Sequence, residues 1–433
     1  MHKNIRAGIA AAATLAMVSS GAMADTVTVV TSFPKELTEA YKKAYEKKYP
    51  ADKVEILNKG TPAGMAYVRE QPAGSRAEIF WASAPDAFEV LAQEKLLAKV
   101  DVATGNIPAK VGDYPINDPE GFYRGQALAG YGLMWNTRYM QAHKLPVPKE
   151  WVDLTKPVYF GHVATSSPSR SGTTHLTFET ILQGEGWDKG WTQILQIAGN
   201  SAQITERSFG VPDGVQNGQF GIGLVVDFFG LAAKSSGFPT DFAYPSVTAI
   251  VPANIAVVAG AKSPEAAKRF MQYTLSDEGQ ALLLDPKISR LPVLKETYAK
   301  APKGYPNPFD GSITAKVKFD SDLSQNRYYV VSSLFDQVIT FRHKELAAAT
   351  QAIHEAQKRL GTRASPQLEE AKKLAWTVPV TEQQAKDAEL LRTFAAKKGD
   401  DAAVKRKTQI EEEWSTRAKA NYTRAAELAA AAK

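Results

Sequence analysis

Hydroxyl side chains surround one arginine in the segment between Ser166 and His175. The residues there that could bind an anion are Ser169, Arg170, Ser171, Gly172, Thr173, Thr174 and His175. Serine, threonine and glycine favour a helix start, where unpaired N–H groups and the positive end of the helix dipole attract anions. A guanidinium adds a fork of donors for phosphate or carboxylate oxygens. The segment predicts an anion-binding cradle, although an ordinary capped helix would use the same residues.

His175 of the cradle and three further polar residues could add to anion binding. His175 falls in the first turn of the predicted helix and could donate to a ligand oxygen, or it could face solvent or the core. Arg207 and Ser208 precede another predicted helix and form a second candidate clamp, unless Arg207 only pairs with its neighbouring glutamate. Asp227 follows a buried apolar run, where it would accept from ligand hydroxyls or orient the arginines.

The beginning of the sequence predicts a strand, a helix and a second strand with short connections. Residues 26–33 are rich in threonine and valine, residues 35–49 have apolar residues at helical spacing, and residues 53–57 form another apolar run. This order predicts a parallel β-sheet covered by helices. In such sheets ligands bind beyond the carboxyl ends of the strands.

Side chains at predicted strand ends are therefore candidates for contact with a ligand. Ser32 ends the first strand, and Trp81 and Ser83 lie where the apolar run after Glu78 reaches a turn. Tyr131 lies between two glycines in an extended segment. Trp81 could equally be a core residue.

Two long extended segments divide the sequence into nested α/β units. Residues 126–136 connect a first unit to a second, and residues 247–258 return the chain to the first. The second unit contains a predicted strand near 158–163, then the cradle, then a buried strand at 221–229. We expect two lobes joined by paired crossover strands, with a cleft between them.

Composition restricts the ligand and partner classes. The 433 residues include 52 lysines and arginines against 46 aspartates and glutamates, a net charge of +6. This dilute bias suits a small anionic ligand and argues against nucleic acid or membrane binding. With 44% hydrophobic residues the chain can fill a core, and without cysteine it forms no disulfide or thiolate metal site.

Residues 1–24 have the pattern of a secretory signal peptide. Basic residues precede a small, apolar run from Ala7 to Val18, and Ala22-Met23-Ala24 precedes Asp25. We expect cleavage before Asp25 and a soluble periplasmic protein, because no later segment offers about 18 uninterrupted apolar residues.

Enzyme and metal signatures are absent from the sequence. It has no Walker, H-E-x-x-H, G-x-G-x-x-G or G-x-S-x-G pattern, and its six histidines lack metal-ligand spacing. We therefore expect no enzyme activity, no catalytic residue, no metal and no cofactor. The pair Tyr328-Tyr329 could form a ferric site with phenolate ligands, but adjacent tyrosines are more often packing residues.

Beyond about residue 302 the pattern changes. Residues 304–309 are rich in turn formers, residues 332–360 have a helical pattern, and residues 379–433 are alanine-rich with mixed charge and no strand signal. We expect long helices or a partly frayed helical tail there.

Four motifs resemble those of one protein family. They are residues 167–175 (SPSRSGTTH), 204–214 (ITERSFGVPDG), 227–230 (DFFG) and 286–292 (PKISRLP). With the signal peptide and the nested lobes, they resemble the periplasmic solute-binding proteins of bacterial ABC transporters. The similar branch includes ferric, phosphonate and sugar-phosphate binders. Within it, the four motifs look most like those of the phosphoglycerate-transport binding (regulatory) protein. The resemblance covers residues 25–344.

The resemblance implies an α/β protein with the type II two-lobed periplasmic-binding-protein fold, two crossover hinge strands and a helical C-terminal tail. Lobe 1 would comprise residues 25–130 and 252–345, and lobe 2 residues 131–251. Residues 346–433 would form an extension outside the resemblance. Ser32 matches a serine of the family's first strand, and the cradle matches its anion-binding turn.

The implied function is binding of a small phosphorylated or phosphonate organic anion, phosphoglycerate-like or a sugar phosphate. Phe228 and Phe229 stand where ferric relatives carry tyrosines, which argues against iron. We expect a monomer that closes on this ligand by hinge motion and delivers it to a membrane ABC permease. Two alternatives stay open: a ligand-sensing partner of a membrane histidine kinase, and a ferric-ion-binding protein.

Overall fold

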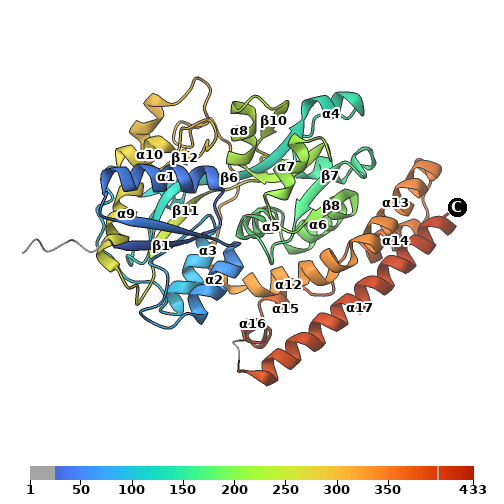
Figure 1. Ribbon diagram of the computed structural model, residues 1–433. Coiled ribbons are helices and arrows are strands. Elements are labelled where there is room, and N and C mark those ends of the chain that lie inside the picture. The colour runs from blue at the N-terminus through green and yellow to red at the C-terminus, as the bar shows by residue number, and fades with distance from the viewer. Residues whose placement is uncertain (1–24, 397–398) are drawn as a thin grey trace, which may run out of the picture.

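The computed structural model describes residues 25–396 and 399–433, so the predicted signal peptide lies outside the described residues. These residues form an α/β body followed by a helical C-terminal extension, as Figure 1 shows. The α/β class and the helical extension are therefore confirmed.

The strands are short except for two. They are β1 Thr26–Thr31, β2 Lys53–Asn58, β3 Ile79–Ala82, β4 Lys110–Val111, β5 Tyr114–Pro115, β6 Arg124–Asn136, β7 Val163–Ser166, β8 Ser201–Thr205, β9 Ile222–Val226, β10 Thr240–Ala243, β11 Ile250–Val257 and β12 Leu291–Pro292. The two long strands, β6 and β11, are the segments expected to cross between the lobes.

The helices of the α/β body cover both faces of the sheet. They are α1 Lys35–Lys48, α2 Thr61–Glu70, α3 Pro85–Gln93, α4 Thr137–Ala142, α5 Gly172–Glu185, α6 Trp187–Asn200, α7 Gly210–Gln216, α8 Asp227–Ser235, α9 Pro264–Leu275 and α10 Asp277–Leu282. Several of them, including α2, α3 and α9, have proline in the first turn, where its missing N–H costs nothing.

Residues 321–396 and 399–433 are helical apart from their turns and are called the extension from here on, so the extension now also includes residues 321–345, which were expected in lobe 1. The helices of the extension are α11 Ser321–Asn326, α12 Tyr328–Val338, α13 His343–Leu360, α14 Pro366–Ala375, α15 Glu382–Ala385, α16 Ala388–Phe394 and α17 Asp401–Ala431. Short 3-10 helices occupy Trp151–Thr155, Pro157–Tyr159, Lys295–Lys300 and Thr340–Arg342.

Strand pairing joins the two lobes into one sheet. Its order is β2-β1-β3-β11-β6-β9-β7-β8, and β10 and β12 also pair with β6. Strand β6 pairs with β11 up to Gly130 and with β9 from Tyr131 onward. This change of partner falls where we expect the boundary between the lobes, after residue 130. The crossover strands hold the lobes in a defined orientation because each pairs with its neighbours along the sheet.

Some element boundaries differ from the expectation. The strand expected near 158–163 is a 3-10 turn followed by β7, because Pro157 starts a helical turn. Strand β9 ends at Val226, so Asp227, Phe228 and Phe229 begin α8 rather than end a strand. Helix α2 was not predicted, because Pro62 and Gly64 in its first turns have low helix propensity.

The C-terminal extension packs as part of the core rather than as a frayed tail. Helix α17 lies along α13, α14 and α12, and α13 packs on α6 of the second lobe (Figure 1). One cluster of buried side chains joins all parts of the chain, with Phe88 from lobe 1, Trp191 from lobe 2, and Phe335 and Trp414 from the extension. The extension therefore contributes to the folded stability of the body.

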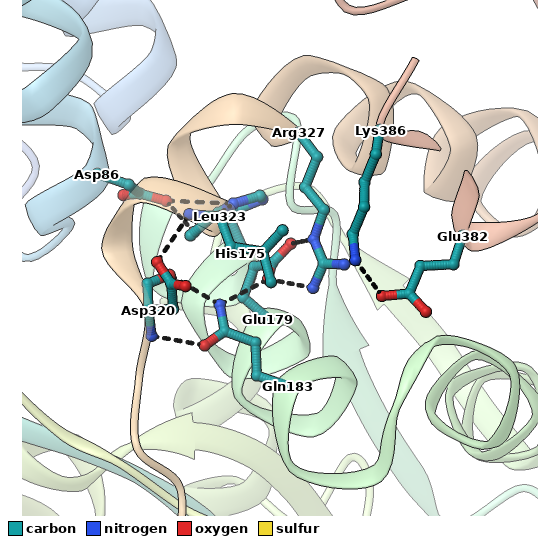
Figure 2. Close-up of polar contacts among 10 residues, drawn as sticks. Asp86, His175, Glu179, Gln183, Asp320, Leu323, Arg327, Glu382 and Lys386 are labelled. Carbon is teal, nitrogen blue, oxygen red and sulfur yellow. Dashed lines mark hydrogen bonds and ion pairs between the residues drawn. The ribbon is translucent and has the colours of Figure 1, made fainter. Parts of the chain in front are cut away.

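Helices α11 and α12 connect the two lobes directly. In lobe 1, α11 packs on α3, and Arg69 of α2 donates to the Tyr329 hydroxyl of α12 at 2.7 Å. In lobe 2, α5 presents His175, Glu179 and Gln183 to the extension, as Figure 2 shows. These three residues recur every fourth position and so share one helix face.

A buried ion pair is central to this contact. The Arg327 guanidinium donates to both carboxylate oxygens of Glu179, at 2.9 and 2.8 Å, and the two side chains are 2% and 0% exposed. Burial alone would raise the pKa of Glu179, but the charge and hydrogen bonds of Arg327 outweigh it and hold that pKa below its usual value. Each charge therefore requires the other inside the protein.

Asp227 ties the crossover strand to the second lobe. Its fully buried carboxylate accepts from the N–H groups of Gly130 and Phe228, both at 2.7 Å, and from the Tyr244 hydroxyl at 2.9 Å. Burial raises the pKa of Asp227 to about 7, although these donors and nearby Arg290 act to lower it. The carboxylate is thus engaged by the backbone at the junction between the lobes.

Replacing one member of the Arg327–Glu179 pair should destabilise the protein strongly. Arg327→Met should lower the free energy of unfolding by about 3–5 kcal/mol, because Glu179 is left as an unpaired buried charge. Urea unfolding followed by circular dichroism measures this. The double variant Arg327→Met/Glu179→Met should recover most of the lost free energy of unfolding. A loss below about 1 kcal/mol in Arg327→Met would contradict the prediction, because exposed ion pairs contribute that little.

Asp227 should make stability depend on pH. Its pKa is about 7 in the folded state against 3.8 for an ordinary aspartate, so between these values the folded protein binds the extra proton. Its contribution to the free energy of unfolding is full below about pH 4 and should fall by about 1.4 kcal/mol per unit as pH rises to about 7. Denaturant unfolding from pH 4.5 to 7.5 measures the slope.

Asp227→Asn should remove this part of the slope, and Asp188→Asn, at an exposed position of α6, should keep it. Parallel stability profiles for the wild type and Asp227→Asn would contradict the assignment.

Candidate functional site

A small cavity lies between the two lobes where several helices begin. Its volume is about 10 Å³. The lining residues are Ser32, Phe33, Gly60, Thr61, Ser83, Arg170, Ser171, Thr173, Arg207, Ser208, Phe209, Phe228 and Phe229. Hydroxyl groups, two arginines and aromatic rings therefore surround one point from both lobes.

The amino ends of three helices meet at this cavity. Helix α2 begins there at Thr61 from lobe 1, and lobe 2 contributes Ser171 and Thr173 at the start of α5 and Phe228 and Phe229 in the first turn of α8. The first N–H groups of a helix have no intrahelical partner, and the helix dipole adds positive potential at that end. The convergence of three such ends is an arrangement suited to an anion.

The cradle backbone is held in place by its own side chains. Ser171 caps α5 by accepting from the Thr174 N–H at 3.3 Å, and the hydroxyls of Ser166 and Thr174 bond to each other. Ser167 donates to Asp336 of α12 at 2.7 Å. The hydroxyl sequence therefore folds as a helix cap that the extension supports, and this cap presents its N-terminal turn to the cavity.

The two arginines of the site differ in their surroundings. Arg170 is about half exposed and lies 3.2 Å from Glu206. Arg207 donates to Asn58 across the lobes at 3.2 Å and lies over the Phe209 ring at 4.4 Å. Burial lowers the pKa of Arg207, while the charge of Glu206 opposes that shift. Because an arginine stays protonated at neutral pH, an anion beside Arg207 would restore the stabilisation that burial removes.

The lobes touch across the cavity in this structure. The Ser83 and Thr173 hydroxyls are 3.1 Å apart. A Cβ on Gly60 would lie 2.6 Å from the Arg170 carbonyl oxygen, and a Cβ on Gly172 would lie 2.7 Å from the Ala84 Cβ. Only glycine permits these approaches. A cavity of about 10 Å³ holds roughly one water molecule, so a larger ligand requires the lobes to separate.

Seven of the residues predicted from the sequence line this cavity. They are Ser32, Ser83, Arg170, Ser171, Thr173, Arg207 and Ser208. Residues 32 and 83 come from lobe 1 and the other five from lobe 2. The structure thus brings together hydroxyls and cations that lie far apart in the sequence, and their contact with a ligand stays a prediction.

The other seven predicted residues do not line the cavity. Ser169 bonds to Ser167, Gly172 faces Ala84, and Thr174 bonds to Ser166. Trp81 and Tyr131 are both fully buried in the core. Trp81 packs edge-on against Phe33 and Tyr41 because its side of β3 faces the α1 layer. Trp81 is therefore a core residue, which was the alternative to a ligand contact.

His175 and Asp227 also lie away from the cavity, because hydrogen bonds hold both side chains elsewhere. The His175 ring is 0% exposed, with Nε2 3.2 Å from Asp86 and 3.3 Å from Ser324, on the α5 face that meets the extension (Figure 2). Tyr328 packs against the same ring. Asp227 is occupied by its three donors at the lobe junction. Periodicity did not show which face of α5 would meet the extension.

Sequence reasoning missed Phe33, Gly60, Thr61 and Phe209 as cavity residues. A signal for Thr61 was present, because Thr-Pro-Ala after a glycine is typical of a helix start. Arg290 was also missed, although it belongs to the quoted motif at residues 286–292. It lines a larger groove of about 880 Å³ that shares Phe209, Phe228 and Phe229 with the cavity.

The described residues contain neither a metal-ligand cluster nor a membrane-spanning helix. No group of three or more histidine, cysteine, aspartate and glutamate side chains is arranged to hold a metal ion. None of the helices there has the length and apolar character needed to cross a membrane. Tyr328 and Tyr329 pack against His175 and Arg69 respectively.

Comparison with known proteins identifies relatives of this chain. It is similar to the phosphoglycerate transport regulatory protein PgtC of Salmonella typhimurium, with 34% identity over 272 residues. That match covers 62% of this chain and 65% of the relative, which is slightly less than two thirds of the relative's length.

Two solved structures share the fold. One is the periplasmic binding protein AfuA from Actinobacillus pleuropneumoniae with fructose-6-phosphate, with TM-score 0.66, 18% identity, and 73% of this chain and 99% of that chain covered. The other is iron-bound HitA from Pseudomonas aeruginosa, with TM-score 0.60, 18% identity, and 71% and 98% covered. The expected periplasmic-binding-protein fold is confirmed.

A family model described as bacterial extracellular solute-binding protein matches residues 76–309, more than half of the chain. This chain belongs to the bacterial extracellular solute-binding protein family.

Proposed function

We propose that this protein is the periplasmic substrate-binding component of an ABC transporter and binds a small phosphorylated or phosphonate organic anion between its lobes. The observation that carries this proposal is the convergence of three helix amino ends and two arginines on one interlobe cavity. Such a site stabilises negative charge with oriented N–H groups and guanidinium donors. Chemistry on the ligand is not needed, and the protein acts by binding.

The proposed contacts can account for much of the free energy of micromolar binding. A hydrogen bond to a charged group contributes about 1.5–3 kcal/mol. Micromolar binding corresponds to about 8 kcal/mol. A few bonds from Arg207, Ser171 and Thr173 would supply much of this, with the aromatic rings covering the organic part. Closure of the lobes over the ligand would exclude water and strengthen these bonds.

The relatives support the ligand class. PgtC is named for phosphoglycerate transport, and the AfuA structure contains fructose-6-phosphate. Both compounds are phosphate esters of small organic molecules. The protein would then bind a phosphoglycerate-like compound or a sugar phosphate and deliver it as a monomer to a membrane permease.

A sensing role is the second candidate function. The matched relative PgtC is named a regulatory protein, and the helical extension here is packed against both lobes. A partner that contacts the extension could therefore distinguish an open from a closed cleft. Deleting the gene separates the two roles, because loss of uptake and loss of transporter induction are different outcomes.

Iron is the less favoured ligand. Phe228 and Phe229 have no ligand atoms, and Tyr328 and Tyr329 are packed against other side chains. An absorbance titration with Fe(III) after chelator treatment tests this, because phenolate ligands would produce a visible charge-transfer band.

Binding should depend on the arginines of the cavity. Arg207→Ala and Arg170→Ala should each lower the affinity for a bound phosphate ester by about tenfold or more, because each removes a charge-assisted contact. Isothermal titration with 3-phosphoglycerate, fructose 6-phosphate and 2-aminoethylphosphonate measures this. Arg207→Ala should have the larger effect, since Arg207 is the more buried of the two.

Arg138→Ala is the matched control, because Arg138 is an exposed arginine of α4 outside the cavity. Equal affinity in all three variants would remove the cavity as the ligand site. A protein that binds none of the phosphorylated or phosphonate compounds would refute the proposed ligand class.

A further inference from the structure

Arg290 is a buried cation without a hydrogen-bond partner. Its side chain is 1% exposed, and none of its three guanidinium nitrogens has a partner among the described residues. The guanidinium carbon lies 3.9 Å from the ring centre of Phe33 and 3.8 Å from that of Phe228. Aromatic faces from both lobes therefore contact this cation, while its N–H groups have no acceptor.

The protein shows elsewhere what a satisfied buried arginine looks like. Arg327 is 2% exposed and donates to both oxygens of Glu179. An arginine carries five N–H donors and stays charged at neutral pH, so leaving it buried without acceptors is unfavourable. Contacts with the two rings recover only part of that cost. The difference between the two arginines indicates that an acceptor for Arg290 comes from outside the described chain.

The nearby acidic side chain does not fill this role. Asp227 is close enough for its charge to raise the pKa of Arg290, yet burial dominates and lowers that pKa to about 9. Both Asp227 oxygens are already used by backbone N–H groups and the Tyr244 hydroxyl. Tyr41, Tyr305 and Tyr131 lie near enough to influence the pKa of Arg290, but none of them accepts a hydrogen bond from the guanidinium.

The position of Arg290 places it within reach of a ligand in the cleft. Phe33 and Phe228, the two rings it contacts, also line the small interlobe cavity. Arg290 itself lines the adjoining groove, whose outer part carries Lys35 and Lys287 together with acidic Glu36 and Asp213. These side chains are exposed, whereas Arg290 is at the buried end.

We propose that Arg290 is a second anion anchor of this cleft and that it binds a carboxylate of the ligand whose phosphate is held at the cradle. This inference rests on the proposed function. A guanidinium that stacks on rings keeps its N–H groups for acceptors in its own plane, and a planar carboxylate accepts two of them side by side. A neutral hydroxyl there would leave the charge uncompensated. The ligand is thus a phosphorylated carboxylic acid rather than a phosphate ester of an uncharged sugar.

Two pairs of compounds that differ only at the carboxylate test this proposal. They are 3-phosphoglycerate with glycerol 3-phosphate, and 6-phosphogluconate with glucitol 6-phosphate. Titration calorimetry on the full chain, freed of bound ligand, should show at least one pair in which the acid binds about tenfold or more tightly. Equal binding of acid and alcohol in every pair that binds would overturn the role of Arg290 and leave the proposed function standing. Binding of fructose 6-phosphate or 2-aminoethylphosphonate but of none of these four would overturn the carboxylate role alone, and binding of none of the six compounds would refute both.

Variants of Arg290 separate its role from folding. Arg290→Met should reduce the preference for the acid to about threefold or less and leave the alcohol's affinity within about threefold of the wild type. Its melting temperature without ligand should be unchanged or higher, because an unpaired buried charge is replaced by an apolar side chain. Arg290→Lys, which keeps the charge, should retain part of the preference.

Arg207→Ala is the contrasting variant, since it should weaken the acid and the alcohol alike. If Arg290→Met weakens both compounds equally while remaining folded, Arg290 supports the site as a whole and the carboxylate assignment is wrong. The discrimination by the wild-type protein decides the proposal even if a variant fails to fold.

Discussion

Strand β6 is hydrogen-bonded in both lobes, and the candidate site depends on this shared strand. Its first half pairs with β11 and its second half with β9, so the two halves of the sheet have a defined relative orientation. That orientation places the amino end of α2 opposite the amino ends of α5 and α8. Asp227 joins β6 to α8 through the Gly130 N–H and thereby couples the strand to the cavity wall. The backbone hydrogen bonds of β6 thus determine where the positively polarised helix amino ends meet.

Two buried arginines illustrate how the protein treats charge. Arg327 lies within a bidentate pair and holds the extension to α5, where the carboxylate of Glu179 compensates its burial. Arg290 lies between the lobes with its donors unpaired. Because burial is unfavourable for an unpaired charge, the first arrangement suits structure and the second suits a site that a ligand completes.

The helical extension changes what opening of the cleft requires. Helices α11 and α12 contact α2 and α3 of one lobe and α5 of the other, and the later helices α13 and α17 pack on α6 and α12. Arg69–Tyr329, Asp86–Ser324 and Arg327–Glu179 bond the extension to both lobes. Separation of the lobes must therefore pivot about α11 and α12 or break some of these bonds. The cradle is linked to the same helices through Ser167 and Asp336.

The sequence by itself determined the elements whose signals are local. A run rich in threonine and valine predicted β1, helical spacing predicted α1, and the hydroxyl run predicted a helix start with an anion-binding character at Arg170. These depend on nearest neighbours along the chain, as do caps and turns. Element boundaries near Pro157 and Asp227 were less certain because turn residues compete with strand propensity there.

Only the tertiary structure decided which side chains meet. His175 and Trp81 have the residue types of a binding site, but packing directs them to the extension and to the α1 layer. Arg290 has no local signal, since its significance lies in two rings from distant segments and in the absence of an acceptor among the described residues. Sequence periodicity assigns a residue to a face, whereas the partner on that face depends on how separate elements pack.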